Sequence, residues 1–319
     1  MSQVRSRYWQ LCGGTCWSGY KQGQGCGGSP EREDGWLAQR QAEEENARMN
    51  LEQPFFLLND RMNISSPQRF DALADRYASS EVHTSSPTLD RLHELLPQVE
   101  SVCDVASGAG HTGLGFAGIA SRIVAVDPAP GMLAQCRRLA AERGVTLETV
   151  QAYAEAIPLP SETFDLVTCR VAAHHFTDLP KAMSEMTRLA KPGGHVAVID
   201  MEGNDDPSLD ALNHEIEMLH DPTHVRSYTA RHWRELFVAS GLEITACETR
   251  LREMPGGLTV RRWCELGNSG AEALHAIRNR LAAASPESLA ALEITRDADG
   301  EFRIPVRTLL IIGRKAAKS

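Results

Sequence analysis

The sequence predicts an α/β fold built on a mostly parallel, doubly wound sheet. From Ser101 onward, short β-rich runs alternate with helical stretches, as in consecutive βαβ units. The first of these strands leads directly into a glycine-rich loop. The chain has 319 residues, of which 42% are hydrophobic, so it can bury a large core in one domain with insertions.

Each strand is predicted from a short apolar run, and each helix from a period of about 3.6 residues. The predicted strands are residues 102–105, 122–126, 146–151, 164–169, 195–201, 243–249 and 308–313. The predicted helices between the first five strands are residues 113–120, 131–143 and 179–190. The segment Lys191-Pro192-Gly193-Gly194 is expected to end the last of these helices.

The segments outside this alternation define the predicted domain organisation. Residues 1–48 are rich in Gly, Ser, Gln and charge, and are expected to be disordered. Residues 49–100 are expected to form an N-terminal helical cap, because helical periodicity runs over 67–77 and 87–96. Residues 101–319 form the sheet domain. Its two insertions, 202–225 and 251–306, are helical in pattern and are expected to build a substrate chamber.

Composition and charge argue against several classes of protein. A formal charge of −9 disfavours a nucleic-acid partner, since such surfaces need clustered Lys and Arg. No run of 18 apolar residues predicts a membrane span, and the N-terminus lacks the apolar core of a secretory signal. Cys12, Cys16 and Cys26 have no metal-ligand spacing, so no metal is predicted. We expect a soluble, cytoplasmic monomer or homodimer with reduced thiols.

The glycine loop after the first strand is the most informative motif, and by itself it has two interpretations. Gly108, Gly110 and Gly113 spell G-x-G-x-x-G between a strand and a helix, where backbone N–H groups can approach a ligand closely. Asp127 follows at the position of a ribose-binding acid, as in dinucleotide-binding proteins. An oxidoreductase that uses NAD(P) or a flavin is therefore one hypothesis.

Asp104 favours a different ligand. Its carboxylate lies four residues before Gly108 at the end of the strand, where it would repel a pyrophosphate and attract an ammonium or sulfonium group. Three further segments follow in order: Ala-Glu-Ala-Ile-Pro-Leu-Pro at 154–160, Phe-Asp-Leu-Val at 164–167 and Lys-Pro-Gly-Gly at 191–194. The last apolar run, residues 308–313, follows the long insertion at 251–306.

In this order the motifs resemble those of class I S-adenosylmethionine-dependent methyltransferases. Residues 70–250 resemble the ubiquinone/menaquinone biosynthesis C-methyltransferase type, methyltransferase domain type 11. The resemblance implies a Rossmann-like seven-stranded sheet of order 3-2-1-4-5-7-6 with an antiparallel last strand. It also implies S-adenosyl-L-methionine as cofactor and C-, O- or N-methylation of a small organic molecule. A cofactor-binding protein without catalytic activity is a third hypothesis.

The same resemblance implies which residues bind the cofactor. Tyr153 stands at a position that is often Asp in relatives. The implied residues are Tyr77 over the methionine end; Asp104, Ala106, Gly108 and Gly110 in the loop; Asp127 for the ribose diol; Pro128 and Met132 beside the adenine; Ala154 and Glu155 at its edge; and Arg170 and Val171 near the transferred methyl group.

Histidines are the best candidates for the chemistry, because an acceptor must lose a proton during methyl transfer. His174 and His175 follow the fourth strand, at the rim where open α/β sheets bind ligands, and only one of the pair is expected to point inward. His224 lies in the first insertion. We predict all three as catalytic, with the alternative that the pair only shapes its loop. Arg226 and Trp263 are predicted to bind the substrate, with ion pairing and a surface position as the alternatives.

Overall fold

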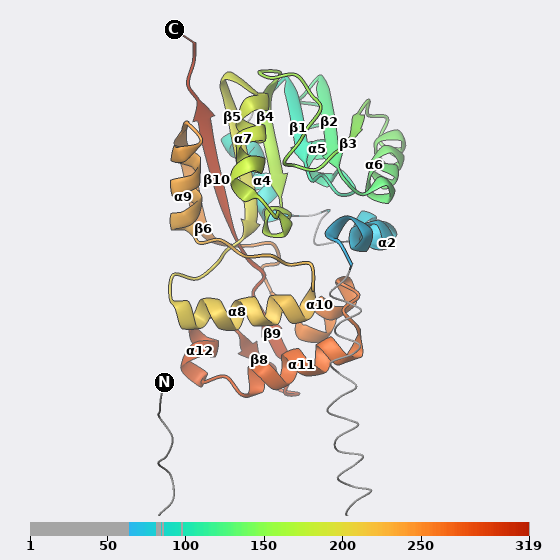
Figure 1. Cartoon of the computed structure of the whole chain (residues 1–319). Helices are drawn as coiled ribbons and strands as arrows, with labels where there is room; N and C mark the ends of the chain where they lie inside the picture. The colour runs from blue at the N-terminus through green and yellow to red at the C-terminus, as the bar shows by residue number, and fades with distance from the viewer. Residues whose placement is uncertain (1–63, 81–83, 85, 97, 319) are drawn as a thin grey trace, which may run out of the picture. The chain divides into compact units, whose positions relative to one another are not determined.

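A seven-stranded sheet forms the centre of the fold (Figure 1). The computed structural model describes residues 64–80, 84, 86–96 and 98–318, and gives the strand order β3-β2-β1-β4-β5-β10-β6. β10 is antiparallel to both of its neighbours, whereas the other pairs are parallel. This confirms the predicted order 3-2-1-4-5-7-6, because β10 is the last strand of this sheet along the chain. The strands are β1 (Ser101–Val105), β2 (Arg122–Asp127), β3 (Glu148–Gln151), β4 (Phe164–Arg170), β5 (Ala190–Met201), β6 (Leu242–Arg252) and β10 (Arg307–Lys315).

Helices cover both faces of the sheet. α7 (Leu179–Leu189) and α9 (Ala230–Ala239) bury Met183, Met186 and Trp233 against one face. α4 (Pro87–Leu95) buries Leu89 and Leu92 against the other face. β1 is therefore buried along its whole length, as expected of a central parallel strand. α4 therefore belongs to one of the helical layers that cover the sheet.

α2 (Ser66–Ala78) is the helix that reaches the ligand-binding end of the sheet. It begins at a capping box formed by Ser65 and Gln68. It packs on α6 (Pro130–Glu142), where the Gly131 N–H donates to Asp71 Oδ1 over 2.5 Å. α2 thereby lies beside the loop that follows β2.

Two insertions lie beyond the carboxyl ends of the parallel strands (Figure 1). The first contains α8 (Pro207–His220), which runs across the end of the sheet. The second contains α10 (Val260–Leu266), α11 (Gly270–Ala282) and α12 (Pro286–Ala291), and these bury a separate core with α8. The purely helical prediction for this segment was wrong. It also contains a small antiparallel sheet of β7 (Leu258–Thr259), β9 (Phe302–Ile304) and β8 (Thr295–Arg296), whose two- and three-residue strands are too short to show a period of two.

Smaller differences from the prediction concern element ends. α5 is only His111–Gly115, because three glycines between 113 and 118 weaken a longer helix. α7 ends at Leu189, and Lys191-Pro192-Gly193-Gly194 lies at the irregular start of β5. The predictions for residues 1–48 fall outside the described residues. Within the described part of the chain, no helix is both long and apolar enough to cross a bilayer.

Candidate functional site

A cavity of about 340 Å³ opens at the carboxyl ends of β1, β2 and β4. This is the edge where open α/β sheets bind ligands. Its walls come from the glycine loop, the turn after β2, the loops after β3 and β4, and α2. The lining residues are Ser65, Ser66, Pro67, Phe70, Tyr77, Ala106, Ser107, Gly108, Ala109, His111, Thr112, Asp127, Pro128, Ala129, Met132, Tyr153, Ala154, Glu155, Arg170, Val171, Ala172, His175, Phe176 and Thr177.

Asp104, at the end of β1, binds the backbone of the glycine loop. Its carboxylate is buried and accepts a hydrogen bond from the Gly113 N–H at 2.8 Å. Burial raises the pKa of Asp104 to about 7, against the opposing effect of that hydrogen bond. Asp104 therefore closes the loop onto the strand and does not line the cavity, contrary to the expectation that it meets a cationic ligand.

Gly110 is also behind the cavity wall. Its φ is +85°, and a Cβ at this position would lie 2.3 Å from the Sγ of Cys136 on α6. Only glycine fits, because both the backbone conformation and the contact with α6 exclude a side chain. Gly110 shapes the loop, and Gly108, with φ of +53°, is the glycine that faces the cavity.

Asp127 joins two loops at the end of β2. Its Oδ2 accepts from the Gly108 N–H and its Oδ1 from the Ala129 N–H, both at 2.8 Å. Each carboxylate oxygen keeps a second lone pair that can accept from a ligand hydroxyl. Burial raises the pKa of Asp127 to about 6, although both backbone hydrogen bonds favour the ionised form. The side chain lines the cavity, with Pro128 and Met132 beside it.

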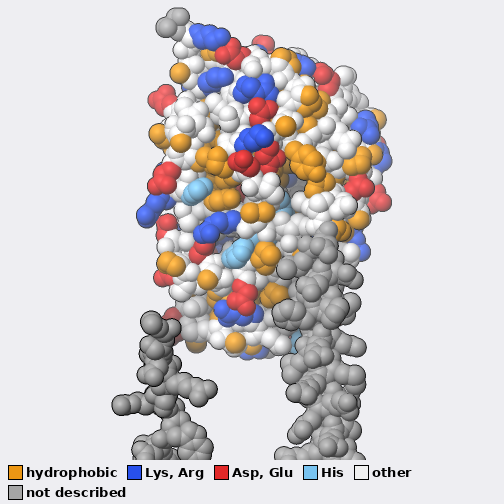
Figure 2. Space-filling view, in the orientation of Figure 1, with side chains coloured by type: hydrophobic (Ala, Val, Ile, Leu, Met, Phe, Trp, Pro, Cys, Tyr) orange, Lys and Arg blue, Asp and Glu red, His pale blue; other side chains and the backbone are white. Residues whose placement is uncertain are grey.

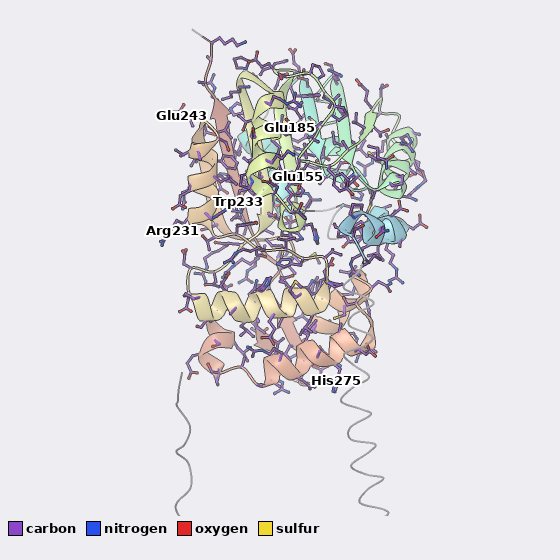
Figure 3. The ribbon with its side chains drawn as sticks, in the orientation of Figure 1. Glu155, Glu185, Arg231, Trp233, Glu243 and His275 are labelled. Atoms are coloured by element: carbon purple, nitrogen blue, oxygen red, sulfur yellow. The ribbon has the colours of Figure 1, made fainter. Side chains whose placement is uncertain are left out.

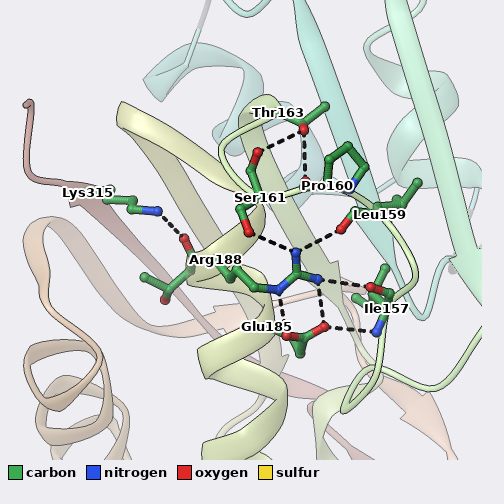
Figure 4. Close-up of polar contacts among 9 residues, drawn as sticks. Ile157, Leu159, Pro160, Ser161, Thr163, Glu185, Arg188 and Lys315 are labelled. Atoms are coloured by element: carbon green, nitrogen blue, oxygen red, sulfur yellow. Dashed lines mark hydrogen bonds and ion pairs between the residues drawn. The ribbon is translucent and has the colours of Figure 1, made fainter.

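A clamp on α7 fixes the loop after β3 (Figure 4). Arg188 donates to the carbonyl oxygens of Ile157 at 2.9 Å and Leu159 at 2.8 Å. Glu185 pairs with Arg188 and accepts from the Ile157 N–H at 2.9 Å. This loop begins with the cavity-lining residues Tyr153, Ala154 and Glu155, so the clamp holds one wall in place from behind.

The exposed rim of this wall carries an aromatic ring and an acid. Tyr153 is 59% exposed although it lines the cavity. Glu155 lies at the end of the sheet that faces α2 and α8, whereas His275 lies on α11, remote from the cavity (Figure 3).

Arg170 and Val171 form the wall at the end of β4. The Arg170 Nε donates to the Thr112 hydroxyl at 3.0 Å, and its Nη1 lies 3.4 Å from a carboxylate oxygen of Glu253. Glu253 also accepts from the hydroxyls of Ser86 and Thr88. The charge of Arg170 is thus balanced inside the protein, as a buried cation requires.

α2 contributes an aromatic wall. The rings of Phe70 and Tyr77 meet edge to face with centroids 5.4 Å apart, and Phe70 also meets the ring of His175 at 5.0 Å. Sequence reasoning singled out Tyr77 but missed Phe70 as a cavity residue. The seven-residue spacing of the two aromatics, two turns on one helix face, is the signal that points to Phe70.

The two adjacent histidines of the turn η1 (Ala173–His175) lie with their ring centroids 4.2 Å apart, but only one of them lines the cavity. His175 lines the cavity, and its Nδ1 lies 3.0 Å from the carbonyl oxygen of Thr223. His174 points away from the cavity, and its Nδ1 lies 2.5 Å from Asp200 Oδ1. His224 stacks on His174 with centroids 5.4 Å apart and does not line the cavity either. The prediction of direct chemistry therefore does not hold for His174 and His224.

The two predicted substrate ligands also lie elsewhere. The Arg226 side chain is 58% exposed and pairs with Asp210 at 2.9 Å, which was the alternative interpretation of that residue. Trp263 stacks on His220 with centroids 3.9 Å apart, in the core of the insertions. Neither lines the cavity. The chain after α8 turns its backbone toward η1, which leaves the Arg226 side chain exposed, and Trp263 is packed on α10 inside the core of the insertions.

Within the ranges that the structure describes, no cluster of His, Cys, Asp or Glu could hold a metal ion. On the face shown in Figure 2, Lys and Arg are interspersed with Asp and Glu, without the continuous basic stripe that nucleic-acid binding requires. The fold places the cavity at the edge where open α/β sheets bind small organic ligands.

Comparisons with known proteins identify the family. A family model described as a methyltransferase domain matches residues 103–198. The chain is 32% identical over 216 residues to the uncharacterized methyltransferase YcgJ of Bacillus subtilis, covering 67% of this chain and 84% of that protein. The crystal structure of YcgJ matches with a TM-score of 0.65 at 30% identity, over 72% of this chain and 99% of that one. The chain therefore belongs to the methyltransferases.

For a second relative, the match to this chain covers less than half of the relative's length. The ubiquinone/menaquinone biosynthesis C-methyltransferase UbiE of an Enterobacter species is 37% identical over 106 residues, which cover 32% of this chain and 42% of that enzyme. The comparisons support methyl transfer and give no support to the oxidoreductase hypothesis or to a protein without catalysis.

Proposed function

We propose that this chain transfers the methyl group of S-adenosyl-L-methionine to a carbon, oxygen or nitrogen atom of a small organic acceptor. One observation carries the proposal. The cavity at the end of the sheet has a carboxylate, Asp127, on one wall and a histidine, His175, on another. The first suits the ribose of the donor, and the second suits removal of a proton from the acceptor.

The residues around Asp127 fit the donor. The carboxylate can accept from both hydroxyls of a ribose, because each oxygen retains a free lone pair. The apolar side chains of Pro128 and Met132 would pack on the purine, and the backbone of Ala154 and Glu155 would border its edge. Ala106 and Gly108, with Arg170 and Val171, would surround the methionine end below Tyr77. When bound, the donor supplies a methyl carbon attached to a positively charged sulfur.

His175 is the proton acceptor in this proposal. The Thr223 carbonyl can only accept, so the Nδ1 of His175 carries the proton and Nε2 holds the lone pair. Burial, assisted by the neighbouring His174, lowers the pKa of His175 to about 4. The ring is thus uncharged at neutral pH. As the acceptor atom bonds to the methyl carbon, the proton leaving that atom goes to Nε2, and the imidazolium then returns it to solvent.

The aromatic wall of α2 would exclude water and align the reactants. The Phe70 ring contacts His175 on one side and Tyr77 on the other, and all three residues line the same cavity. Alignment of the acceptor with the methyl carbon supplies much of the rate in a displacement of this kind.

The test has a binding arm and a turnover arm. In calorimetry, S-adenosylhomocysteine should bind and NADH should not. In turnover, the protein is incubated with methyl-labelled donor and a fractionated small-molecule extract, and labelled products are identified by mass spectrometry. His175→Gln should bind S-adenosylhomocysteine as tightly as the parent but form the labelled product at least about a hundredfold more slowly.

His195→Gln is the matched control, because His195 lies on β5 away from the cavity. It should keep full activity. Binding of NADH in place of S-adenosylhomocysteine would overturn the choice of cofactor. Full turnover by His175→Gln would remove the histidine from the reaction.

A further inference from the structure

His174 and Asp200 form a buried polar pair directly behind the cavity wall. Asp200 lies near the end of β5 with 1% of its surface exposed, and its Oδ1 is 2.5 Å from the Nδ1 of His174. The same oxygen accepts from the Met201 N–H at 2.8 Å. A buried carboxylate this close to an imidazole favours the doubly protonated ring.

The surroundings of His174 strengthen that preference. Besides Asp200, the carboxylates of Glu217 on α8 and Asp221 after α8 act on it, and the ring of His224 stacks on it. His214 on α8 meets the far side of His224. Burial of His174 opposes charge, yet the carboxylates, Asp200 foremost, raise its pKa above the ordinary value. Burial lowers the pKa of His224 to about 2, so this neighbour is uncharged.

The charge of His174 bears on His175. The two rings are 4.2 Å apart between centroids. His175 is affected by the charges of His174, Asp221 and Asp200, and it is packed against Phe70 on α2. A second positive charge on His175 would be repelled by His174 at this distance. Two histidines that are neighbours in sequence are therefore driven to opposite protonation states.

The insertion supplies the second constraint, the tautomer of His175. The accepting carbonyl belongs to Thr223, whose N–H and hydroxyl both donate to Asp221, at 2.8 and 2.7 Å. Asp221 in turn pairs with Arg69 of α2 at 3.0 Å. The N–H groups of Val225 and Arg226 donate to the His174 carbonyl oxygen at 2.8 and 3.1 Å. The loop is thus tied to η1 from both ends.

We propose that Asp200 and the loop at Thr223 are positioning elements for His175. Asp200 keeps His174 as an imidazolium, and the Thr223 carbonyl keeps the proton of His175 on Nδ1, so that His175 presents an unprotonated Nε2 to the cavity. This inference rests on the proposed function only in that His175 receives the acceptor proton. The first insertion is then part of the catalytic apparatus, because its loop at Thr223 sets the state of the base although no residue of the insertion lines the cavity.

The experiment reads the histidine rings directly. The full chain, labelled with ¹⁵N-histidine, is examined by long-range ¹H–¹⁵N correlation spectra between pH 4 and 8, with assignment by His174→Gln and His175→Gln. At pH 7 the parent should show His174 protonated on both nitrogens and His175 protonated on Nδ1 alone. In Asp200→Asn, His174 should become uncharged at pH 7, and the titration midpoint of His175 should rise by about one pH unit or more.

Asp205→Asn is the matched control, since this acid is exposed on the next segment of chain. Its spectra should match the parent. His174→Gln removes the same positive charge, so it should also raise the titration midpoint of His175. This variant provides the test if Asp200→Asn does not fold. A proton on Nε2 of His175, or a midpoint unchanged in both folded variants, would overturn the inference.

The readout needs neither donor nor acceptor, so its outcome is separate from that of the methyl-transfer assay. If His174 and His175 show the expected protonation states but the protein transfers no methyl group, the proposed function is wrong. The roles of Asp200 and Thr223 in setting those protonation states would still stand. Once a product has been identified, Asp200→Asn should move the acid limb of the pH–rate profile upward while S-adenosylhomocysteine binds unchanged.

Discussion

The two sides of the cavity are built in different ways. On the side that we propose for the methyl donor, most of the lining residues belong to the loops after β1, β2 and β3 and lie a few positions from a strand of the sheet. The acceptor side joins α2, η1 and the loop after α8, which are separated by about 100 and about 50 positions in the chain. Local backbone geometry determines the first side, whereas long-range packing determines the second.

The charged groups on the two sides of the cavity are also stabilised in different ways. On the donor side, Asp104 and Asp127 are buried carboxylates held by backbone N–H groups, and burial raises the pKa of both. On the acceptor side, buried charges meet opposite charges from other elements, as in Arg69 with Asp221. Asp127, which lines the cavity, can therefore accept hydrogen bonds from ligand hydroxyl groups, whereas Arg69 and Asp221 neutralise each other within the protein.

The largest expected effect is on the donor side, at Gly110. Gly110→Ala places a Cβ 2.3 Å from Cys136 Sγ at a φ of +85°. Backbone strain and overpacking together should lower the free energy of unfolding by about 3 kcal/mol. Chemical denaturation measures this loss. Gly118→Ala has a φ of +100° but open space around it, so it should cost only about 1 kcal/mol, the strain alone. Equal losses in the two variants would mean that the contact with α6 is unimportant.

The next largest effect is expected at the clamp that Arg188 and Glu185 form behind the loop after β3. Arg188→Met removes hydrogen bonds to three residues of the loop, Ile157, Leu159 and Ser161, and leaves the Glu185 carboxylate unpaired. We expect binding of S-adenosylhomocysteine to weaken about tenfold, equivalent to about 1.4 kcal/mol. Calorimetry measures the change. Arg138→Met, which removes an exposed pair with Glu142 on α6, should bind as the parent does. Unchanged binding by Arg188→Met would show that the loop holds its shape without the clamp.

A pH effect of similar size is expected from Asp127. Only the ionised carboxylate can accept from two ribose hydroxyls, and its pKa is raised to about 6. Affinity for S-adenosylhomocysteine should therefore be complete above pH 7 and fall about tenfold by pH 5, as the carboxyl becomes protonated. Asp127→Asn should bind more weakly at pH 7, by about 1 to 2 kcal/mol, and show no such slope. A slope that persists in Asp127→Asn would assign it to another group, with Asp104 the first candidate.

The smallest effect is expected at Arg226, on the acceptor side. Its pair with Asp210 is mostly exposed, so Arg226→Ala should change the free energy of unfolding by less than about 0.5 kcal/mol. Turnover and donor affinity should stay at parental values, as for Arg231→Ala, which removes another exposed arginine. A large loss of turnover would return Arg226 to the list of substrate ligands and would show that the loop moves when the acceptor binds.

The donor side was largely predictable from sequence, and the acceptor side was not. The strand–glycine loop–helix pattern and the acid at Asp127 give local signals, and ten of the twelve predicted cofactor residues line the cavity; Asp104 and Gly110 do not. Among the acceptor-side candidates, only His175 lines it. Asp200 gave no signal, because it reads as an ordinary residue at the end of an apolar strand.

The doubly wound sheet, the glycine loop and the acid at Asp127 could be predicted from local sequence, because alternation of strands and helices and the need for positive φ are properties of neighbouring residues. The order of the strands was implied by the resemblance to the methyltransferases. Tertiary packing sets which of the two histidines lines the cavity. That choice depends on where β5 places Asp200 and where the insertion places the Thr223 carbonyl. Asp200 and Thr223 each lie more than twenty residues along the chain from the histidine that they contact. No local sequence pattern therefore predicts which imidazole ring each of them will contact.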